Sequence, residues 1–314
     1  MDLVTFGEAM VRLRPPASQR LEEAQSFDAH VGGSELNVAV LAARLGVKSR
    51  WVSRLPNNPL GRMIAARAGE QGVDAHIDWT ADGRVGLYFL EPGPAVHITS
   101  VLYDRAGSAI STITPGSIDW PFVFSGARWY HVSGITPALS NSAAQVTAES
   151  LSAAKQAGLT VSYDLNYRSQ LWSVEQARAV QEPLLEYVNV LIITEEDARV
   201  VFGAESAESL ARRFALGAVA MTLRDNPCAA IVAADGETRS APRYVVETVD
   251  RIGAGDAFTG GLIVSRLENR GWDDALRFAT ATAALKHTIP GDFCLVTRGE
   301  VDQLLRGETS RVSR

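Results

Sequence analysis

Residues 250–261 read Asp250-Arg-Ile-Gly-Ala-Gly-Asp-Ala-Phe-Thr-Gly-Gly261 and carry the most informative pattern of this sequence. Three small residues come directly before the carboxylate of Asp256, and apolar residues then recur at helical spacing from Phe258 to Leu267. This pattern predicts a tight turn that leads into the N-terminus of a helix. The free amides and the positive dipole of such an end attract a phosphate or another oxyanion. Glycines let the backbone come close to that anion.

Asp256 is out of place in a site that only binds an anion, because its own charge repels one. Its presence makes sense if it takes the proton from a hydroxyl group that attacks the phosphate, which would mean phosphoryl transfer to an alcohol. A plainer explanation is that Asp256 caps the helix, and these residues alone do not decide between the two. The chain contains no P-loop, and Phe258 stands where a dinucleotide fingerprint needs its last glycine.

The composition is that of an ordinary globular protein. Of the 314 residues, 46% are hydrophobic and 21% are charged, which allows one large α/β domain or two smaller ones. A net charge of −6 argues against nucleic acid as a partner. Cys228 and Cys294 match no metal or redox spacing, and the five histidines do not cluster. We expect a cytoplasmic protein with no secretory signal and no contact with membranes.

Strand and helix patterns alternate along most of the chain, which predicts an α/β fold with a mostly parallel sheet and helices on both faces. Strands are expected near 3–6, 51–53, 129–132, 160–163, 190–193 and 218–223. Helices are expected near 34–45, 59–72, 142–157, 175–187 and 195–202, with two more over 256–288 joined at Gly271-Trp272. Residues 229–233 and 244–248 look like antiparallel or edge strands.

Two further strands, near 85–90 and 96–103, interrupt this alternation and are joined by the turn signal Glu91-Pro-Gly-Pro94. Together with residues 10–14 they can form a small sheet outside the main body. In the main sheet, ligands bind beyond the carboxyl ends of parallel strands. Three polar clusters follow predicted strands at that edge, and they comprise residues 164–168, 194–197 and 253–256.

At two places the sequence resembles the ribokinase-like (PfkB) sugar kinases. Gly32-Gly-Ser-Glu-Leu-Asn37, followed by Ala43-Arg-Leu-Gly46, resembles the first signature of this family, and residues 250–263 resemble the second. The resemblance covers essentially the whole chain, and the two motifs in this order are highly specific. Finer features resemble the 2-keto-3-deoxygluconate kinases, namely Gly7-Glu8, Leu102-Tyr-Asp-Arg105, Ser133-Gly-Ile-Thr-Pro-Ala-Leu139, Asp164-Leu-Asn-Tyr-Arg-Ser-Gln-Leu-Trp172 and Ala284-Leu-Lys-His-Thr-Ile-Pro-Gly-Asp292.

The resemblance implies a single Rossmann-like α/β domain over 1–314, with a β-sheet lid formed by approximately 10–31 and 84–105. It also implies a homo-oligomer, a dimer or larger, that forms through the lid. The activity implied is Mg²⁺- and ATP-dependent phosphorylation of the 6-hydroxyl of 2-keto-3-deoxygluconate, and a monovalent cation is left open. The alternatives are a kinase for keto-deoxygalactonate, fructose or an inositol-pathway acid, and a sugar-binding homologue without turnover.

The family pattern assigns roles to residues of both motifs. Asp256 is the expected general base, and the backbone of Gly253, Ala254, Gly255 and Asp256 is the expected anion hole. The residues expected at the sugar are Gly32, Gly33, Ser34, Asn37, Tyr88, Tyr103, Arg105, Arg168 and Asp292. Those expected at the nucleotide are Asn166, Arg168, Thr194, Arg224, Gly253, Gly255 and Thr280.

Several of these residues have a second explanation. Ser34 can be a helix cap, and both tyrosines can be packing residues of the lid. Arg168 can bind the carboxylate of a sugar acid, as can Arg105, or it can bind phosphate. The acids at 195–197 fit the first turn of a helix, although one of them could hold Mg²⁺ through water.

Two departures from the family pattern concern the nucleotide. Many members have a glycine-rich loop where this chain has Thr222-Leu-Arg-Asp-Asn-Pro-Cys228, so Arg224 and Asp225 are the candidates to replace it. Arg251 stands where a small residue is usual, and it could add positive charge near phosphates.

Overall fold

The computed structural model describes residues 1–16, 19–91, 93, 100–204, 206–224 and 228–308, and its main element is a nine-stranded sheet. The strands lie in the order β13-β12-β11-β10-β9-β8-β1-β4-β5. Their bounds are β1 (Leu3–Phe6), β4 (Ser49–Pro56), β5 (Asp74–Thr80), β8 (Trp129–Ser133), β9 (Thr160–Asp164), β10 (Val190–Thr194), β11 (Ala218–Thr222), β12 (Cys228–Ala234) and β13 (Glu237–Pro242). All pairs from β11 to β5 are parallel, and β12 and β13 are antiparallel. The expected mostly parallel sheet is therefore confirmed.

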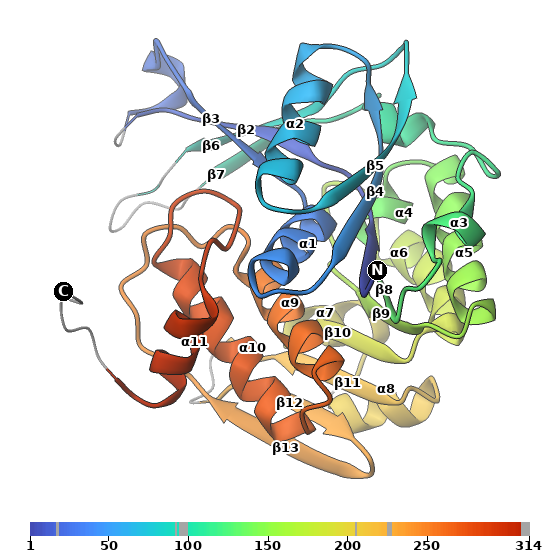
Figure 1. The fold of residues 1–314 in the computed structure, drawn as a ribbon, viewed down its shortest axis with the longest axis vertical. Helices are drawn as coiled ribbons and strands as arrows, with labels where there is room; N and C mark the ends of the chain where they lie inside the picture. The colour runs from blue at the N-terminus through green and yellow to red at the C-terminus, as the bar shows by residue number, and fades with distance from the viewer. Residues whose placement is uncertain (17–18, 92, 94–99, 205, 225–227, 309–314) are drawn as a thin grey trace.

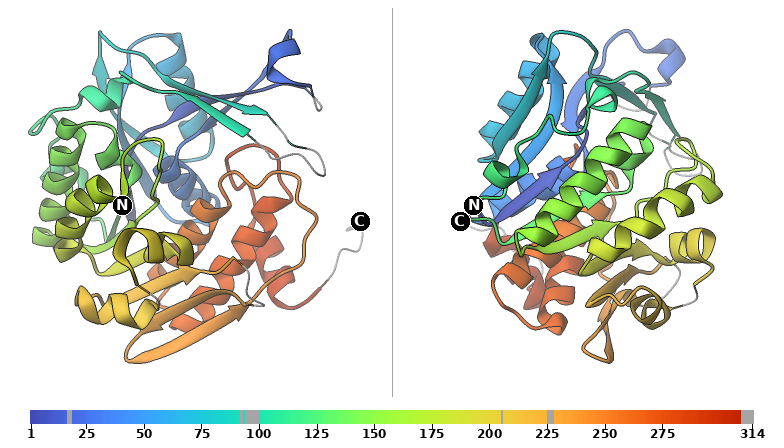
Figure 2. Two further views of the ribbon diagram at one scale, coloured as in Figure 1. Left: turned by 180° about the vertical axis from the view of Figure 1, so that it is seen from behind. Right: turned by 90° about the vertical axis from the view of Figure 1, so that its right-hand side faces the viewer.

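Helices cover both faces of this sheet (Figure 1 and Figure 2). On one face lie α1 (Ser34–Arg44), α2 (Pro59–Glu70), α9 (Ala254–Leu267), α10 (Trp272–His287) and α11 (Arg298–Leu305). On the other lie α3 (Trp120–Val123), α4 (Ile135–Ala138), α5 (Asn141–Gln156), α6 (Val174–Leu184), α7 (Glu195–Phe202) and α8 (Ala207–Arg213). Each face buries its own apolar core against the sheet. None of the described helices is long and apolar enough to cross a membrane.

A second sheet of four strands projects from the body and matches the expected lid (Figure 1). Its order is β3 (Asp28–Gly32), β2 (Met10–Arg14), β6 (Gly86–Glu91) and β7 (Ser100–Asp104). Strand β2 pairs in parallel with β6 and antiparallel with β3, and β7 pairs antiparallel with β6. Two of the four residues of the turn predicted at 91–94, Pro92 and Pro94, and the predicted strand residues 96–99 lie outside the described residues.

One predicted strand is wrong. Residues 244–248 have no regular structure, and the antiparallel partner of β12 is β13 at 237–242. Asp235 and Gly236 both have positive φ, of 55° and 76°, and form a tight hairpin directly after β12. An Asp-Gly pair is a strong signal for such a turn, and it starts the returning strand earlier than predicted.

Candidate active site

A cavity of about 330 Å³ lies at the carboxyl ends of the parallel strands, on the side where the lid strands approach the body. Both sequence motifs and all three polar clusters contribute to its wall. The lining residues are Met10, Gly32, Gly33, Ser34, Asn37, Tyr88, Tyr103, Arg105, Ile135, Asp164, Asn166, Arg168, Thr194, Asp197, Arg251, Ile252, Gly253, Gly255, Asp256 and Asp292. The structure therefore gathers most of the predicted site residues around one space.

Asp256 connects the two motifs. Its Oδ1 accepts a hydrogen bond of 2.7 Å from the hydroxyl of Ser34, and its Oδ2 accepts one of 2.6 Å from Nδ2 of Asn37. Both donors belong to α1, whereas Asp256 lies in the first turn of α9. Ser34 makes no capping bond to its own helix, which Gly33 precedes as N-cap. The capping explanation for Ser34 is therefore wrong, and the side chain faces the acid instead.

Burial disfavours ionisation of three carboxylates that line the cavity. Burial raises the pKa of Asp256, although the hydrogen bonds from Asn37 and Ser34 oppose this. Burial and then the charge of Asp256 raise the pKa of Asp164 well above its usual range. Burial also raises the pKa of Asp197. A carboxylate with a raised pKa is a stronger base, and a group of them favours a bound cation.

The turn before α9 needs glycine at position 253. Gly253 has a φ of 82°, in the left-handed region, and a Cβ there would collide with the carbonyl oxygen of Asp292. Gly255 and Asp256 lie in the first turn of the helix, where amides have no partner within the helix. Ala254 does not line the cavity, and its amide donates to the carbonyl of Arg251 at 3.3 Å. The free amides of the turn that can face the cavity are therefore those of Gly255 and Asp256.

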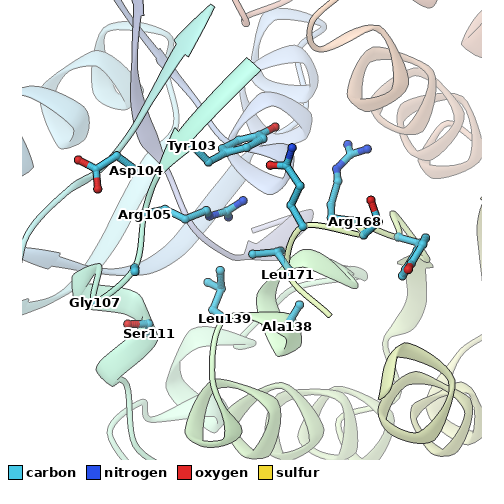
Figure 3. A pocket seen from close by; sticks show the side chains of 13 residues that line it. Tyr103, Asp104, Arg105, Gly107, Ser111, Ala138, Leu139, Arg168 and Leu171 are labelled. Atoms are coloured by element: carbon cyan, nitrogen blue, oxygen red, sulfur yellow. The ribbon is translucent and has the colours of Figure 1, made fainter. Parts of the chain in front are cut away.

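Two arginines reach the cavity and differ in burial and in ion pairing. Arg105 forms a buried ion pair with Glu8, so part of its guanidinium is already used. Arg168 is exposed and forms no ion pair with any residue that the structure describes. Both also line a neighbouring pocket of about 570 Å³, where Tyr103 and Arg105 reach in from the lid and Arg168 stands on the opposite side (Figure 3). The two spaces therefore share a positively charged border.

The two lid tyrosines differ in the same way. Tyr88 is buried, and its hydroxyl donates to Asp292 in a short contact. Its ring packs beside that of Tyr103 with centroids 5.7 Å apart. Burial raises the pKa of Asp292 to about 6, although the charge of Arg12 opposes this. Tyr103 is 36% exposed and lines both pockets, so it is the tyrosine that is free to contact a ligand.

The residues predicted for the nucleotide fall into two groups. Asn166 and Thr194 line the cavity, and Nδ2 of Asn166 donates to Ser34 at 3.2 Å. Arg224 and Thr280 do not line it. Arg224 is exposed with Glu196 at 3.5 Å, and the buried hydroxyl of Thr280 donates to the carbonyl of Leu276. Their nucleotide roles stay predictions, and residues 225–227 lie outside the described residues.

The described part of the chain contains no cluster of three or more His, Cys, Asp or Glu side chains that could hold a metal on its own. Thr194 caps α7, so the acids at 195–197 form the first turn of that helix, and Asp197 alone of the three reaches the cavity. Mg²⁺ usually takes only one or two carboxylates together with substrate phosphates. Asp164 and Asp197 fit that requirement.

Three buried charged groups near the cavity were missed in the sequence. Oε1 of Glu35 accepts bonds from the amide and hydroxyl of Ser133 and from the hydroxyl of Thr136, and burial raises the pKa of Glu35 to about 7. Arg12 and Lys286 are the other two, and both are fully buried. A charged residue on an otherwise apolar helix face was the available signal for Glu35 and Lys286.

Comparisons with known proteins show which proteins this chain resembles. The family model described as pfkB family carbohydrate kinase matches residues 1–292. The chain is 40% identical to a 2-dehydro-3-deoxygalactonokinase of Haloferax volcanii, over 100% of this chain and 99% of that protein. A solved 2-dehydro-3-deoxygluconokinase of Thermotoga maritima has a TM-score of 0.93 and 40% identity, over 98% of this chain and 100% of that one.

A third similarity concerns the fold alone. A sugar kinase of Pyrococcus horikoshii, solved in complex with ATP, has a TM-score of 0.82 at 24% identity, over 95% of this chain and 96% of that one.

Proposed function

Because this chain belongs to the pfkB family of carbohydrate kinases, we propose that it transfers the γ-phosphoryl group of ATP to the 6-hydroxyl of 2-keto-3-deoxygluconate. The observation that carries the proposal is the position of Asp256. Its carboxylate is held between Ser34 and Asn37, at the edge of a cavity that the anion-binding turn also lines. A base and an anion site thus face the same space, as transfer to an alcohol requires.

The reaction balances with the residues of this chain. Asp256 accepts the proton of the 6-hydroxyl group while the oxygen of that hydroxyl group forms a bond to the γ-phosphorus. The bond from that phosphorus to the β–γ bridging oxygen breaks, and ADP leaves with the electron pair. The amides of Gly255 and Asp256 stabilise the charge on the transferring group. Mg²⁺ would arrive with ATP and neutralise phosphate charge, with Asp164 and Asp197 as the carboxylates placed to hold it.

The preference for an acid rests on the arginines. Arg168 has no internal ion pair among the described residues, and it stands at the border of the cavity with Arg105. A guanidinium matches the two oxygens of a carboxylate, whereas a neutral sugar offers it no charged partner. We assign Arg105 and Arg168 to the carboxylate of the sugar acid. Tyr103 and Asp292 are assigned to other parts of the sugar.

A second candidate substrate is 2-keto-3-deoxygalactonate. It differs from the first at one carbon, and the relative from Haloferax volcanii that bears this activity in its name is as similar as the Thermotoga structure, at 40% identity each. The same base, anion hole and arginines serve either acid, so the choice between them depends on contacts to one hydroxyl.

A coupled assay of ADP release tests the proposal. The panel contains the two keto-deoxy acids, fructose and an inositol-pathway acid, each at several concentrations so that kcat/KM is obtained. We expect the gluconate form to give the highest value. A preference for the galactonate form would move the assignment to the second candidate. Turnover of neutral sugars only would refute the acid preference, and sugar binding without ADP release would refute the kinase activity.

The carboxylate assignment has its own test in Arg105. We expect Arg105→Ala to raise the KM for the keto acid about 10–100-fold and to change the KM for ATP far less, because one charged hydrogen-bonding partner is lost. The substitution alone leaves the buried carboxylate of Glu8 unpaired. It is therefore combined with Glu8→Gln, and Glu8→Gln alone is the matched control. An equal effect on both Michaelis constants would contradict the assignment.

A further inference from the structure

Lys286 is a charged side chain that the proposed reaction does not use. It stands in the last turn of α10, and 0% of its surface is exposed. Its Nζ donates to the carbonyl oxygen of Asp250 at 3.2 Å and to that of Ile289 at 2.9 Å. The nearby carboxylates of Asp250 and Asp292 form their ion pairs with Arg12 instead. The ammonium is thus held by backbone carbonyls of two separate segments.

Those two segments are the turn that we propose to bind the phosphoryl group and the loop that packs against it. Asp250 opens the turn at 250–256, and Ile289 opens the loop that ends at Asp292. Both segments meet at Gly253, where a Cβ would collide with the carbonyl oxygen of Asp292 and would lie 3.5 Å from Cε of Lys286. The side chain of Lys286 therefore lies directly against the turn that leads into α9.

Burial of an ammonium group costs free energy because the charge loses its hydration. An uncharged side chain of similar length would not have this cost, so a buried lysine calls for an explanation. Its surroundings offset part of this cost. Asp250 and Asp292 bring two negative charges to the cluster, while Arg12 and Lys286 bring two positive ones. Burial lowers the pKa of Lys286, and the charges of the two acids oppose this. The charge of Lys286 also acts on Asp256, whose pKa it lowers in opposition to burial.

We propose that Lys286 is a positioning residue for phosphoryl transfer, which joins the 250–256 turn to the 289–292 loop and places its ammonium group beneath the anion hole. Backbone carbonyls can coordinate potassium, as they do in the filters of potassium channels. The ammonium thus stands where a monovalent cation could otherwise bridge the two segments, and the reaction needs no added cation of this kind. The inference rests on the proposed role of the Gly253–Asp256 turn.

The test compares the whole protein and Lys286→Met in buffers whose only monovalent cation is either tetramethylammonium, K⁺ or NH₄⁺. We expect the wild-type kcat to change less than about twofold between these buffers. In tetramethylammonium we expect Lys286→Met to lose about 10²-fold in kcat, while the KM for the sugar acid changes less than about threefold. NH₄⁺ or K⁺ should restore kcat of the variant at least about tenfold, because either ion can occupy the space between the carbonyls.

Lys155→Met is the matched control. Nζ of Lys155 also donates to a backbone carbonyl, that of Glu186 at 2.7 Å, but it lies exposed at the end of α5. We expect this variant to keep the wild-type kcat in all three buffers. Circular dichroism and thermal melting verify that each variant is folded, and Lys286→Gln replaces Lys286→Met if the latter is not.

Three outcomes would overturn the inference. The first is a wild-type enzyme that K⁺ activates more than about tenfold, which needs no variant to detect. The second is a folded Lys286→Met with wild-type kcat. The third is a folded variant whose loss of kcat neither cation relieves, because Lys286 would then support only the structure. Failure of the proposed substrate is visible separately, since wild type would then release ADP with other sugars, and those sugars would serve for the same comparison.

Discussion

At the level of single residues, Asp256 is held by donors that come from another helix. Ser34 and Asn37 each donate a hydrogen bond to one carboxylate oxygen of Asp256. These bonds fix the orientation of the carboxylate, which does not serve as a cap for its own helix. Asparagine at this position keeps the shape of the side chain but cannot accept a proton. We expect Asp256→Asn to fold, to bind the sugar acid with a modest change in affinity, and to lose about 10²–10⁴-fold in kcat, measured by ADP release.

Asp274→Asn is the control for the loss of an acidic side chain from the first turn of a helix. Asp274 also lies in the first turn of a long helix, α10, but it is exposed and does not line the cavity. Its substitution removes a favourable interaction with the helix dipole and nothing else that bears on the reaction. Unchanged turnover in Asp256→Asn, or a similar loss in Asp274→Asn, would remove Asp256 from the mechanism.

A shared site for Asp256, Ser34 and Asn37 could be predicted, because short motifs rich in glycine carry polar side chains that serve a ligand. The direct hydrogen bonds from Ser34 and Asn37 to Asp256 were not predicted, since the family pattern places both donors at the sugar. Lys286 could not be predicted in the same way. Its partners are backbone carbonyls of Asp250 and Ile289, and a carbonyl leaves no mark in the sequence of residue types. Backbone partners are visible only after folding brings the two segments together.

At the level of elements, α9 begins at the turn that we propose to be catalytic, and the helix depends on two glycines for its position. A Cβ on Gly260 would lie 3.0 Å from Cδ2 of Leu41 in α1. A Cβ on Gly261 would collide with the hydroxyl of Thr282 and lie 3.0 Å from Cα of Ala279, both in α10. These glycines let α9 pack closely between its neighbours, which keeps Asp256 within reach of Ser34.

We expect Gly261→Ala to destabilise the protein by about 1–3 kcal/mol, because the backbone of α10 cannot yield to the added methyl group. Gly69→Ala in α2 is the control, since no described atom lies within 4 Å of the Cβ that it would add. Alanine there should stabilise the helix by about 0.5–1 kcal/mol. Urea denaturation of the two variants measures both effects, and an unchanged midpoint for Gly261→Ala would contradict the close packing.

The central strands, which alternate with helices along the chain, could be predicted well. The strands at the edges of the sheet could not. The parallel strands β1, β8, β9 and β10 are short, largely buried runs, and such runs predict strands of a parallel sheet. Strand β5 at the sheet edge reads Asp74-Ala-His-Ile-Asp-Trp-Thr80 and is only half-buried, so its composition resembles that of a loop. Edge strands bury little apolar surface, so their conformation depends on turn geometry or on pairing with a neighbouring strand.

At the level of the whole molecule, the lid is tied to the body through buried charges. Arg12 of β2 pairs with Asp250 at 2.9 Å and with Asp292 at 3.1 Å, and Tyr88 of β6 donates to the same Asp292. The lid strands therefore contact the 250–256 turn through Asp250 and the adjoining 289–292 loop through Asp292. The sequence predicted the lid, yet it gave no sign of this link, because its three charged residues are far apart along the chain.

The outer surface of the lid leads to the last prediction, that two copies associate through it. Strand β7 is an edge strand of the lid sheet, and Leu102 on it is 61% exposed. Side chains alternate along a strand, so Leu102 faces away from the cavity that Tyr103 lines. An exposed apolar edge strand is a surface that a second copy can cover. We expect light scattering to give a dimer or larger for wild type and a monomer for Leu102→Asp. Val245→Asp is the control, because Val245 is 99% exposed but lies outside the lid, and it should leave the assembly intact. A monomeric wild type, or a Leu102→Asp variant of unchanged size, would contradict association through the lid.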